Sequence, residues 1–236
     1  ELNSDTNIAE AEIDETTLED ILRNVETDET GVKSITIDIP VVENAEAYKL
    51  TIPSSAVNST ESSHTTVVKT DIATVTLPSN MLASETKIKD EKVSLIVASG
   101  DKSDLPAELQ AEIGNRPLIK LGLEVNGKKV DWENKMAPVK VSIPYKPSKA
   151  ELADPEHITV WYIDGEGNVI PVSSGRYDPE TGMVTFSVTH FSQYAVVFVK
   201  KTFEDIGQIS WAKKQIEVLA SKGIIKGIND KEFAPN

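Results

Sequence analysis

Alternation of apolar and polar residues is the feature that most constrains the fold of this chain. From about residue 32 to residue 200, apolar residues recur at every second position, as in Ser34-Ile35-Thr36-Ile37-Asp38-Ile39. Successive side chains of a β-strand point to opposite faces, so this pattern lets one face be buried. The runs predicted as strands are 34–39, 47–52, 65–70, 72–77, 92–98, 117–125, 138–143, 158–163, 168–172, 183–189 and 193–200.

Two turn-rich stretches indicate hairpins between these strands. They are Asp164-Gly165-Glu166-Gly167-Asn168 and Tyr177-Asp178-Pro179-Glu180-Thr181-Gly182, and both contain glycines that can adopt positive φ. The first stretch is similar to the opening of a calcium loop, but it lacks the bidentate acid at the twelfth position, which favours a turn. The sequence therefore predicts a mainly β fold, as one antiparallel β-sandwich or two packed ones, with a short C-terminal helical segment.

The N-terminal segment has a different character, because most of its charge is acidic. The chain has a formal net charge of -14, and residues 1–31 contain Arg23 as their single base. Without clustered Lys and Arg, nucleic-acid binding is not expected. The segment is predicted to be an acidic linker, a docked helix or an acidic docking segment. A helix would be capped by Thr17, with one apolar face made by Leu18, Ile21, Leu22 and Val25.

Several kinds of site are excluded or disfavoured by composition. The chain has no cysteine, which excludes disulfides, thiolate zinc sites and a cysteine nucleophile. His64 and His157 have no partners at ligand spacing, so we expect no metal and no cofactor. No run of 18 apolar residues and no apolar leader occurs, so neither a membrane span nor a signal peptide is expected.

A helical period follows residue 200. Ala212, Ile216, Leu219 and Ala220 fall on one helical face, Ser210 occupies the N-cap position, and Gly223 is placed to end the helix. Residues 202–236 also resemble the first half of an S-layer homology repeat. The resemblance rests on Phe203-x-Asp205-Ile206, Trp211-Ala212, Ile216-x-x-Leu219-Ala220-x-x-Gly223-Ile224-Ile225-x-Gly227 and Asp230-x-x-Phe233-x-Pro235-Asn236.

This resemblance implies a location and a partner. Repeats of the family usually occur in threes and bind the secondary polysaccharide of a bacterial cell wall. The family's binding groove includes an acid- and arginine-containing stretch beyond the Phe-x-Pro-Asn turn, which this chain does not contain. The resemblance thus implies an extracellular protein of the cell wall or S-layer of a Gram-positive bacterium. Polysaccharide would be bound through repeats missing from this chain, and a surface domain would be linked covalently upstream.

The β region carries a second resemblance. Residues 139–145, 158–164 and 185–196 resemble the extracellular modules that precede wall-anchoring repeats in clostridial surface proteins. They are also similar to the sandwich domain shared by zonula occludens proteins, netrin receptors and ankyrins, here called the ZU-type domain. Some ZU-type domains cleave themselves between the Phe and the Ser of a His-Phe-Ser motif. Carried over to this chain, the scissile bond joins Phe191 to Ser192.

His190-Phe191-Ser192 is therefore the candidate catalytic site. The Ser192 hydroxyl could attack the Phe191 carbonyl in an N-to-O acyl shift, with His190 taking the proton, and water would hydrolyse the ester. The structural interpretation is an ordinary entry to a strand. His190 shares the parity of Val184, Phe186 and Val188, which places it on the apolar side of a strand as a satisfied core histidine.

The structural interpretation is favoured, and we predict a non-catalytic extracellular spacer that leads into a wall-anchoring region. Any enzymatic activity would be single-turnover autoproteolysis. The first alternative is this self-cleaving module, and the second is a carbohydrate-binding module that uses Trp132, Trp161, Tyr162 and Tyr177. The predicted domains are the acidic segment (1–31), the first part of the β-sandwich (32–136), its second part with the His-Phe-Ser motif (137–200) and the incomplete S-layer homology repeat (201–236).

Overall fold

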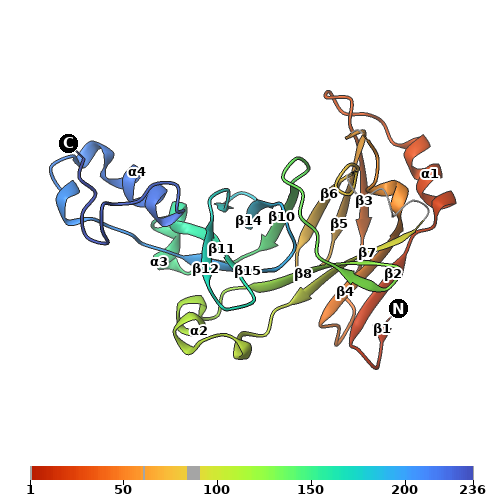
Figure 1. Cartoon of the computed structure of the whole chain (residues 1–236), viewed down its shortest axis with the longest axis horizontal. Helices are drawn as coiled ribbons and strands as arrows, with labels where there is room; N and C mark the ends of the chain where they lie inside the picture. The colour runs from red at the N-terminus through yellow and green to blue at the C-terminus, as the bar shows by residue number, and fades with distance from the viewer. Residues whose placement is uncertain (1, 61, 84–90, 236) are drawn as a thin grey trace. The chain divides into compact units, whose positions relative to one another are not determined.

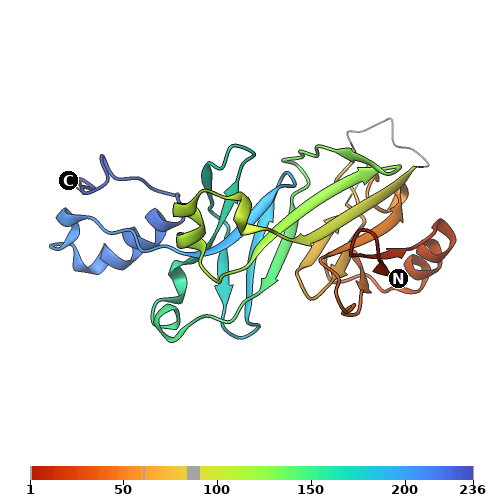
Figure 2. The same cartoon turned by 90° about the horizontal axis from the view of Figure 1, so that it is seen from below.

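The structure is a computed structural model that describes residues 2–60, 62–83 and 91–235 (Figures 1 and 2). The chain forms two compact units and passes between them several times. The first unit contains Glu1–Gly100, Ile119–Ile143 and Ser187–Gln193, and the second contains Asp101–Leu118, Pro144–Phe186 and Tyr194–Asn236. The domain boundaries predicted after residues 31, 136 and 200 are not tested by this division into units, and they stay predictions.

The first unit contains one group of strands in the order β1-β2-β4-β7-β8, with β9 paired to β8. Buried and less buried residues alternate along β4, as expected for a strand with one covered face. The strands span Leu2–Asn3 (β1), Ile8–Glu12 (β2), Ala47–Pro53 (β4), Lys92–Ser99 (β7), Leu118–Val125 (β8) and Lys128–Val130 (β9).

The other strands of this unit follow the order β10-β6-β5-β3. They span Lys33–Asp38 (β3), His64–Lys69 (β5), Thr74–Pro78 (β6) and Val139–Pro144 (β10). The pairs β2·β4 and β3·β5 are parallel, whereas a purely antiparallel arrangement was predicted. The difference arises because the chain crosses over between the paired strands. It passes through α1 (Glu15–Asn24) and β3 before β4, and through β4 before β5.

The second unit combines short sheets with helices. Its strands have the orders β15-β11-β12 and β13-β14. They span Ile158–Ile163 (β11), Val169–Val172 (β12), Arg176–Asp178 (β13), Met183–Val188 (β14) and Gln193–Phe198 (β15). The helices are η3 (Lys102–Asp104), α2 (Ala107–Ile113), α3 (Lys149–Leu152), η4 (Pro155–His157), η5 (Glu204–Ile206) and α4 (Ser210–Ser221), and η1 (Ser54–Ala56) lies in the first unit. One buried cluster of the second unit comprises Leu105, Leu109, Ile113, Leu118, Ile163, Ala195 and Val197.

The mainly β fold is confirmed, and each predicted run overlaps a strand. Both hairpins are also present, with Gly167 at φ 84° between β11 and β12 and Gly182 at φ 69° between β13 and β14. The Asp164 carboxylate accepts hydrogen bonds from the backbone N–H groups of Glu166 (2.9 Å) and Asn168 (2.8 Å). The Asp164 stretch therefore uses its acid to build a turn, as the hairpin interpretation predicted.

The N-terminal segment contains the predicted helix, but its cap was misassigned. Helix α1 begins at Glu15, and Asp14 is the N-cap residue, with its carboxylate accepting from the Thr17 N–H at 2.8 Å. Thr17 supplies a backbone donor because it lies at the third helical position. The predicted apolar face is confirmed in part, because Leu18 is buried, Ile21 and Leu22 are half-buried, and Val25 is the C-cap residue after the helix ends. Strand β2, which the acidic composition concealed, pairs with β4.

Candidate functional site

The His-Phe-Ser motif lies in the first unit, where it connects the end of β14 to the start of β15. His190 forms an isolated antiparallel bridge with Glu133, and the Asn134 N–H donates to the Thr189 carbonyl at 2.7 Å. Val184, Phe186 and Val188 are buried, as their shared parity predicted. Strand β14 ends before His190, which is half-buried. The motif is thus attached to residues 133–134 by backbone pairing.

Phe191 and Ser192 are fixed by further contacts within this unit. The Phe191 ring packs on Trp132 at 4.7 Å between centroids, and the buried Trp132 donates through its indole nitrogen to the Met81 carbonyl at 2.9 Å. The Ser192 carbonyl accepts from the Leu121 N–H at 2.9 Å. Among the described residues, positive φ is not found at 190–192. These contacts explain a structural role for the motif, and the catalytic role of Ser192, His190 and Phe191 stays a prediction.

The other two histidines have structural partners. The buried His64 ring shares a hydrogen bond with the Ala56 carbonyl (3.1 Å), and burial lowers its pKa. The buried His157 ring contacts the Val199 carbonyl (2.9 Å) and the Ser221 hydroxyl (3.0 Å). Within residues 2–60, 62–83 and 91–235, no group of three His, Asp or Glu side chains is arranged to hold a metal ion.

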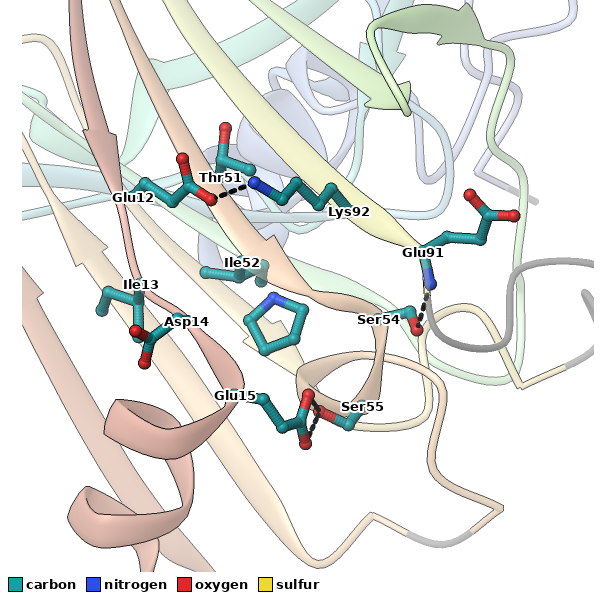
Figure 3. Close-up of a pocket in the computed structure, with 11 residues that line it drawn as sticks. Glu12, Ile13, Asp14, Glu15, Thr51, Ile52, Ser54, Ser55, Glu91 and Lys92 are labelled. Carbon is teal, nitrogen blue, oxygen red and sulfur yellow. Dashed lines mark hydrogen bonds and ion pairs between the residues drawn. The ribbon is translucent and has the colours of Figure 1, made fainter.

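A pocket of about 420 Å³ lies beside the first turn of α1, at the ends of β2 and β4 (Figure 3). Three of its carboxylates take part in local structure. Glu12 forms an ion pair with Lys92, Glu15 accepts from the Ser55 hydroxyl at 2.8 Å, and Asp14 caps α1. Among these three acids, Glu15 joins α1 to Ser55 of η1, Glu12 joins β2 to β7, and Asp14 caps its own helix.

A buried carboxylate in the second unit was missed by sequence reasoning. Glu151 is 5% exposed, and its Oε1 accepts from Arg116 Nε at 2.7 Å and from the Tyr145 hydroxyl at 2.8 Å. Its Oε2 accepts from the Ser148 N–H at 2.7 Å. Burial alone would raise the pKa of Glu151, but the hydrogen bonds from Ser148, Tyr145 and Arg116 lower it to about 2. Burial and this carboxylate raise the pKa of Tyr145 to about 12.

The aromatic residues considered for carbohydrate binding do not share one location. Trp132 is buried, Trp161 packs against the cluster around Leu109, and Tyr162 lies 5.9 Å from the Tyr194 ring. Tyr177 contacts Tyr145 edge to face, at 6.3 Å between ring centroids. Tyr145 was not among the predicted residues, because Tyr177, whose ring it contacts, is distant in sequence.

The C-terminal segment, residues 202–235, has a small core of its own. Phe203, Ile206, Ile216 and Ala220 are buried, and the Phe203 ring lies 5.5 Å from that of Phe233. The predicted face was partly wrong, because Leu219 is 37% exposed. The N-cap was also wrong by one residue, since Ser210 is the first residue of α4 and Ile209 occupies the cap position. Gly223 has φ 69°, as predicted for a helix stop.

Asp205 and Gly227, two residues of the S-layer homology motif, hold the chain of this segment in place. The Asp205 carboxylate accepts from the N–H groups of Phe233 (2.9 Å) and Ala234 (2.7 Å), and these hydrogen bonds lower its pKa. Gly227 approaches its surroundings so closely that a Cβ would lie 2.4 Å from the Glu232 carbonyl oxygen and 2.5 Å from the Phe203 ring. The Asp and Gly positions of the motif therefore fix the path of the chain.

Helix α4 is attached to the strands of the second unit by its C-terminal end. The Ser221 hydroxyl contacts His157 of η4, and Lys222 donates through Nζ to the Gly175 carbonyl. Burial lowers the pKa of Lys222. A Cβ on Gly223 would lie 3.0 Å from Pro171 of β12, so a larger residue there would press on Pro171, and the φ of 69° also favours glycine. The contact between His157 and Ser221 is buried, and a flexible tether would lack such specific contacts.

An ion pair extends the same contact on its solvent side. Lys214 of α4 donates to the Glu156 carboxylate of η4 at 2.8 Å. The Lys214 ammonium lowers the pKa of Glu156, and the Glu156 carboxylate raises that of Lys214. Exposed ion pairs contribute little to stability, so we expect this pair mainly to restrict the orientation of α4 relative to η4.

Comparisons with known proteins identify the C-terminal segment. The model of the S-layer homology domain matches residues 202–236. The amylopullulanase of Thermoanaerobacterium thermosulfurigenes is 42% identical over 99 residues, which are 42% of this chain and 5% of that protein. The chain thus spans about one twentieth of the length of this relative. In the described part of the chain, no helix is long and apolar enough to cross a membrane. The matches show an extracellular protein associated with the cell wall or S-layer.

Proposed function

We propose that this chain is a non-catalytic connector, which joins a surface domain upstream to a wall-anchoring segment. The observation that carries this proposal is the contact of the C-terminal end of α4 and the two residues after it with η4, Gly175 and Pro171 in the second unit. The anchoring segment would serve binding to secondary cell-wall polysaccharide, as in the S-layer homology family. A covalently linked upstream domain, such as the enzyme named in the relative, would carry the activity of the whole protein.

This contact supports a connector that fixes the orientation of the anchoring segment as well as its distance from the strands. Flexible linkers are rich in polar residues and leave neighbouring domains free to move, because few contacts cross them. Here, Val199 and Lys222 form hydrogen bonds with the His157 ring of η4 and with the Gly175 carbonyl between β12 and β13. The anchoring segment therefore starts in a fixed orientation to the strands of the second unit. The ZU-type identity of the β region remains a proposal.

The rival function is self-cleavage between Phe191 and Ser192, which intact mass spectrometry of the purified chain tests directly. A connector requires an unbroken chain between the upstream residues and the segment at 202–235, so we expect one uncut mass after days at neutral pH. Ser192→Ala should have the same integrity as the wild type. Fragments ending at Phe191 and starting at Ser192, abolished by Ser192→Ala, would establish the self-cleaving module instead.

A further inference from the structure

A second pocket lies in the second unit, where residues 115–116 approach residues 145–151. It is open to solvent, its volume is about 440 Å³, and its lining includes Asn115, Arg116, Tyr145, Lys146 and Glu151. This volume is within the usual range for small-molecule sites. The pocket is outside the S-layer homology segment and shares no residue with the His-Phe-Ser motif.

Tyr145 lines the pocket, and its half-buried ring is held in place by contacts within the second unit. Tyr145 donates its backbone N–H to the Gly182 carbonyl at 2.9 Å and its hydroxyl to Glu151 at 2.8 Å. The Tyr177 ring meets it at 85° between ring planes. A side chain held in this way loses little conformational entropy when a ligand packs on it. The apolar C–H face of a sugar ring is a natural partner for such an aromatic ring.

Glu151 also lines the pocket, and its carboxylate already accepts hydrogen bonds from neighbouring protein groups. Three donors, from Arg116, Tyr145 and Ser148, contact the two carboxylate oxygens. A buried ion pair adds little net stability compared with apolar residues of the same volume. Stability alone therefore does not explain why Arg116 and Glu151 are paired here. The network instead holds a guanidinium and a tyrosine in place at the pocket surface.

The groups left for a ligand are mainly donors. Asn115 and Lys146 are exposed at the pocket, and they offer an amide and an ammonium group. Among the lining residues, Arg116 and Lys146 are basic and Glu151 is the one acid, in a chain of net charge -14. A neutral sugar brings hydroxyl donors that need acceptors, whereas a carboxylate brings acceptors alone.

We propose that this pocket binds a carboxylated saccharide, with a sugar ring against Tyr145 and the carboxylate beside Lys146 and Asn115. Such binding would give the chain a contact with acidic glycan outside the anchoring segment, on the strand-bearing part of the second unit. This role goes beyond the connector function and does not depend on it. A connector without this site would still hold the anchoring segment.

Isothermal titration calorimetry of the full chain with tetragalacturonate tests the site, with maltotetraose as the neutral comparison. We expect saturable binding of tetragalacturonate, weakened roughly tenfold by Lys146→Ala and by Asn115→Ala, because each removes a donor to a charged group. Lys149→Ala removes the same charge from an exposed lysine that does not line the pocket, and it should leave the affinity within about twofold.

Three results would overturn the proposal. The first is the absence of saturable tetragalacturonate binding to the wild-type chain. The second is equal affinity for maltotetraose, which would show that the carboxylate is not recognised. The third is an equal loss of affinity in Lys149→Ala and Lys146→Ala, which would show non-specific attraction by surface charge. Both pocket side chains are exposed, so unchanged melting temperatures should accompany their replacement.

Discussion

Replacing Glu151 with alanine is expected to lower the free energy of unfolding by about 3–5 kcal/mol, the usual effect of breaking a buried ion pair. The change leaves the Arg116 guanidinium without its counter-charge and removes the acceptor for the Tyr145 hydroxyl and the Ser148 N–H. Urea unfolding followed by fluorescence measures the effect. Glu108→Ala removes the same charge from an exposed position of α2, and it should change stability by less than about 0.5 kcal/mol.

The pH dependence of the same carboxylate gives an independent check. The folded-state pKa of Glu151 is about 2, below its ordinary value of 4.5. A depressed pKa stabilises the fold above the ordinary value, and this contribution is lost as the pH falls from 4.5 towards 2. The stability difference between wild type and Glu151→Gln should therefore shrink over that interval. A difference that is constant from pH 6 to about pH 2 would contradict the ionised, buried carboxylate.

The second large effect is expected for Phe203→Ala, at about 3–5 kcal/mol for the C-terminal segment. Phe203 is 4% exposed, and its removal opens a cavity beside Phe233 in a core of few residues. Because this core belongs to residues 202–235, unfolding should be local. Hydrogen exchange should lose protection across α4, while the strands β5 and β6 of the first unit keep theirs.

Ile228→Ala is the matched control, since Ile228 belongs to the same segment and is 70% exposed. We expect wild-type protection in this variant, because surface truncations rarely change stability by more than about 0.5 kcal/mol. If Phe203→Ala also kept full protection of α4, the small core would not be what stabilises the segment. If it unfolded β5 and β6 as well, the segment would not be an independent cooperative unit.

The strands could be predicted because their signal is local. Alternation along Ser34–Ile39 or Lys92–Ser99 specifies a buried face without reference to any other part of the chain. Strand β2 was missed because Ile8-Ala9-Glu10-Ala11-Glu12 lies within an acidic segment. It pairs in parallel with β4, which lies 39 residues later in the chain. The parallel pairs themselves depend on crossover connections, which no window of sequence reveals.

The candidate sites were likewise predictable where their residues are close in sequence, and not where they are distant. The S-layer homology motif could be identified because Phe203, Asp205, Gly227 and Phe233 act within one short segment. The Glu151 network was not predictable, since Arg116 lies 35 residues before its partner. The contact between His157 and Ser221 joins residues 64 apart, so a histidine with no apparent role in the sequence becomes an attachment point for α4.

The central claim is that the anchoring segment is docked on the strands of its unit, and a distance measurement between two spin labels tests it. The chain has no cysteine, so Glu180→Cys in the β13–β14 turn and Gln215→Cys on α4 can be labelled without background; both positions are exposed. We predict a single narrow distance distribution. It should broaden in Gly223→Ala, whose Cβ would press on Pro171, and stay narrow in Gly207→Ala, where a Cβ meets no atom within 4 Å. A broad distribution in the unmodified background would contradict the connector account.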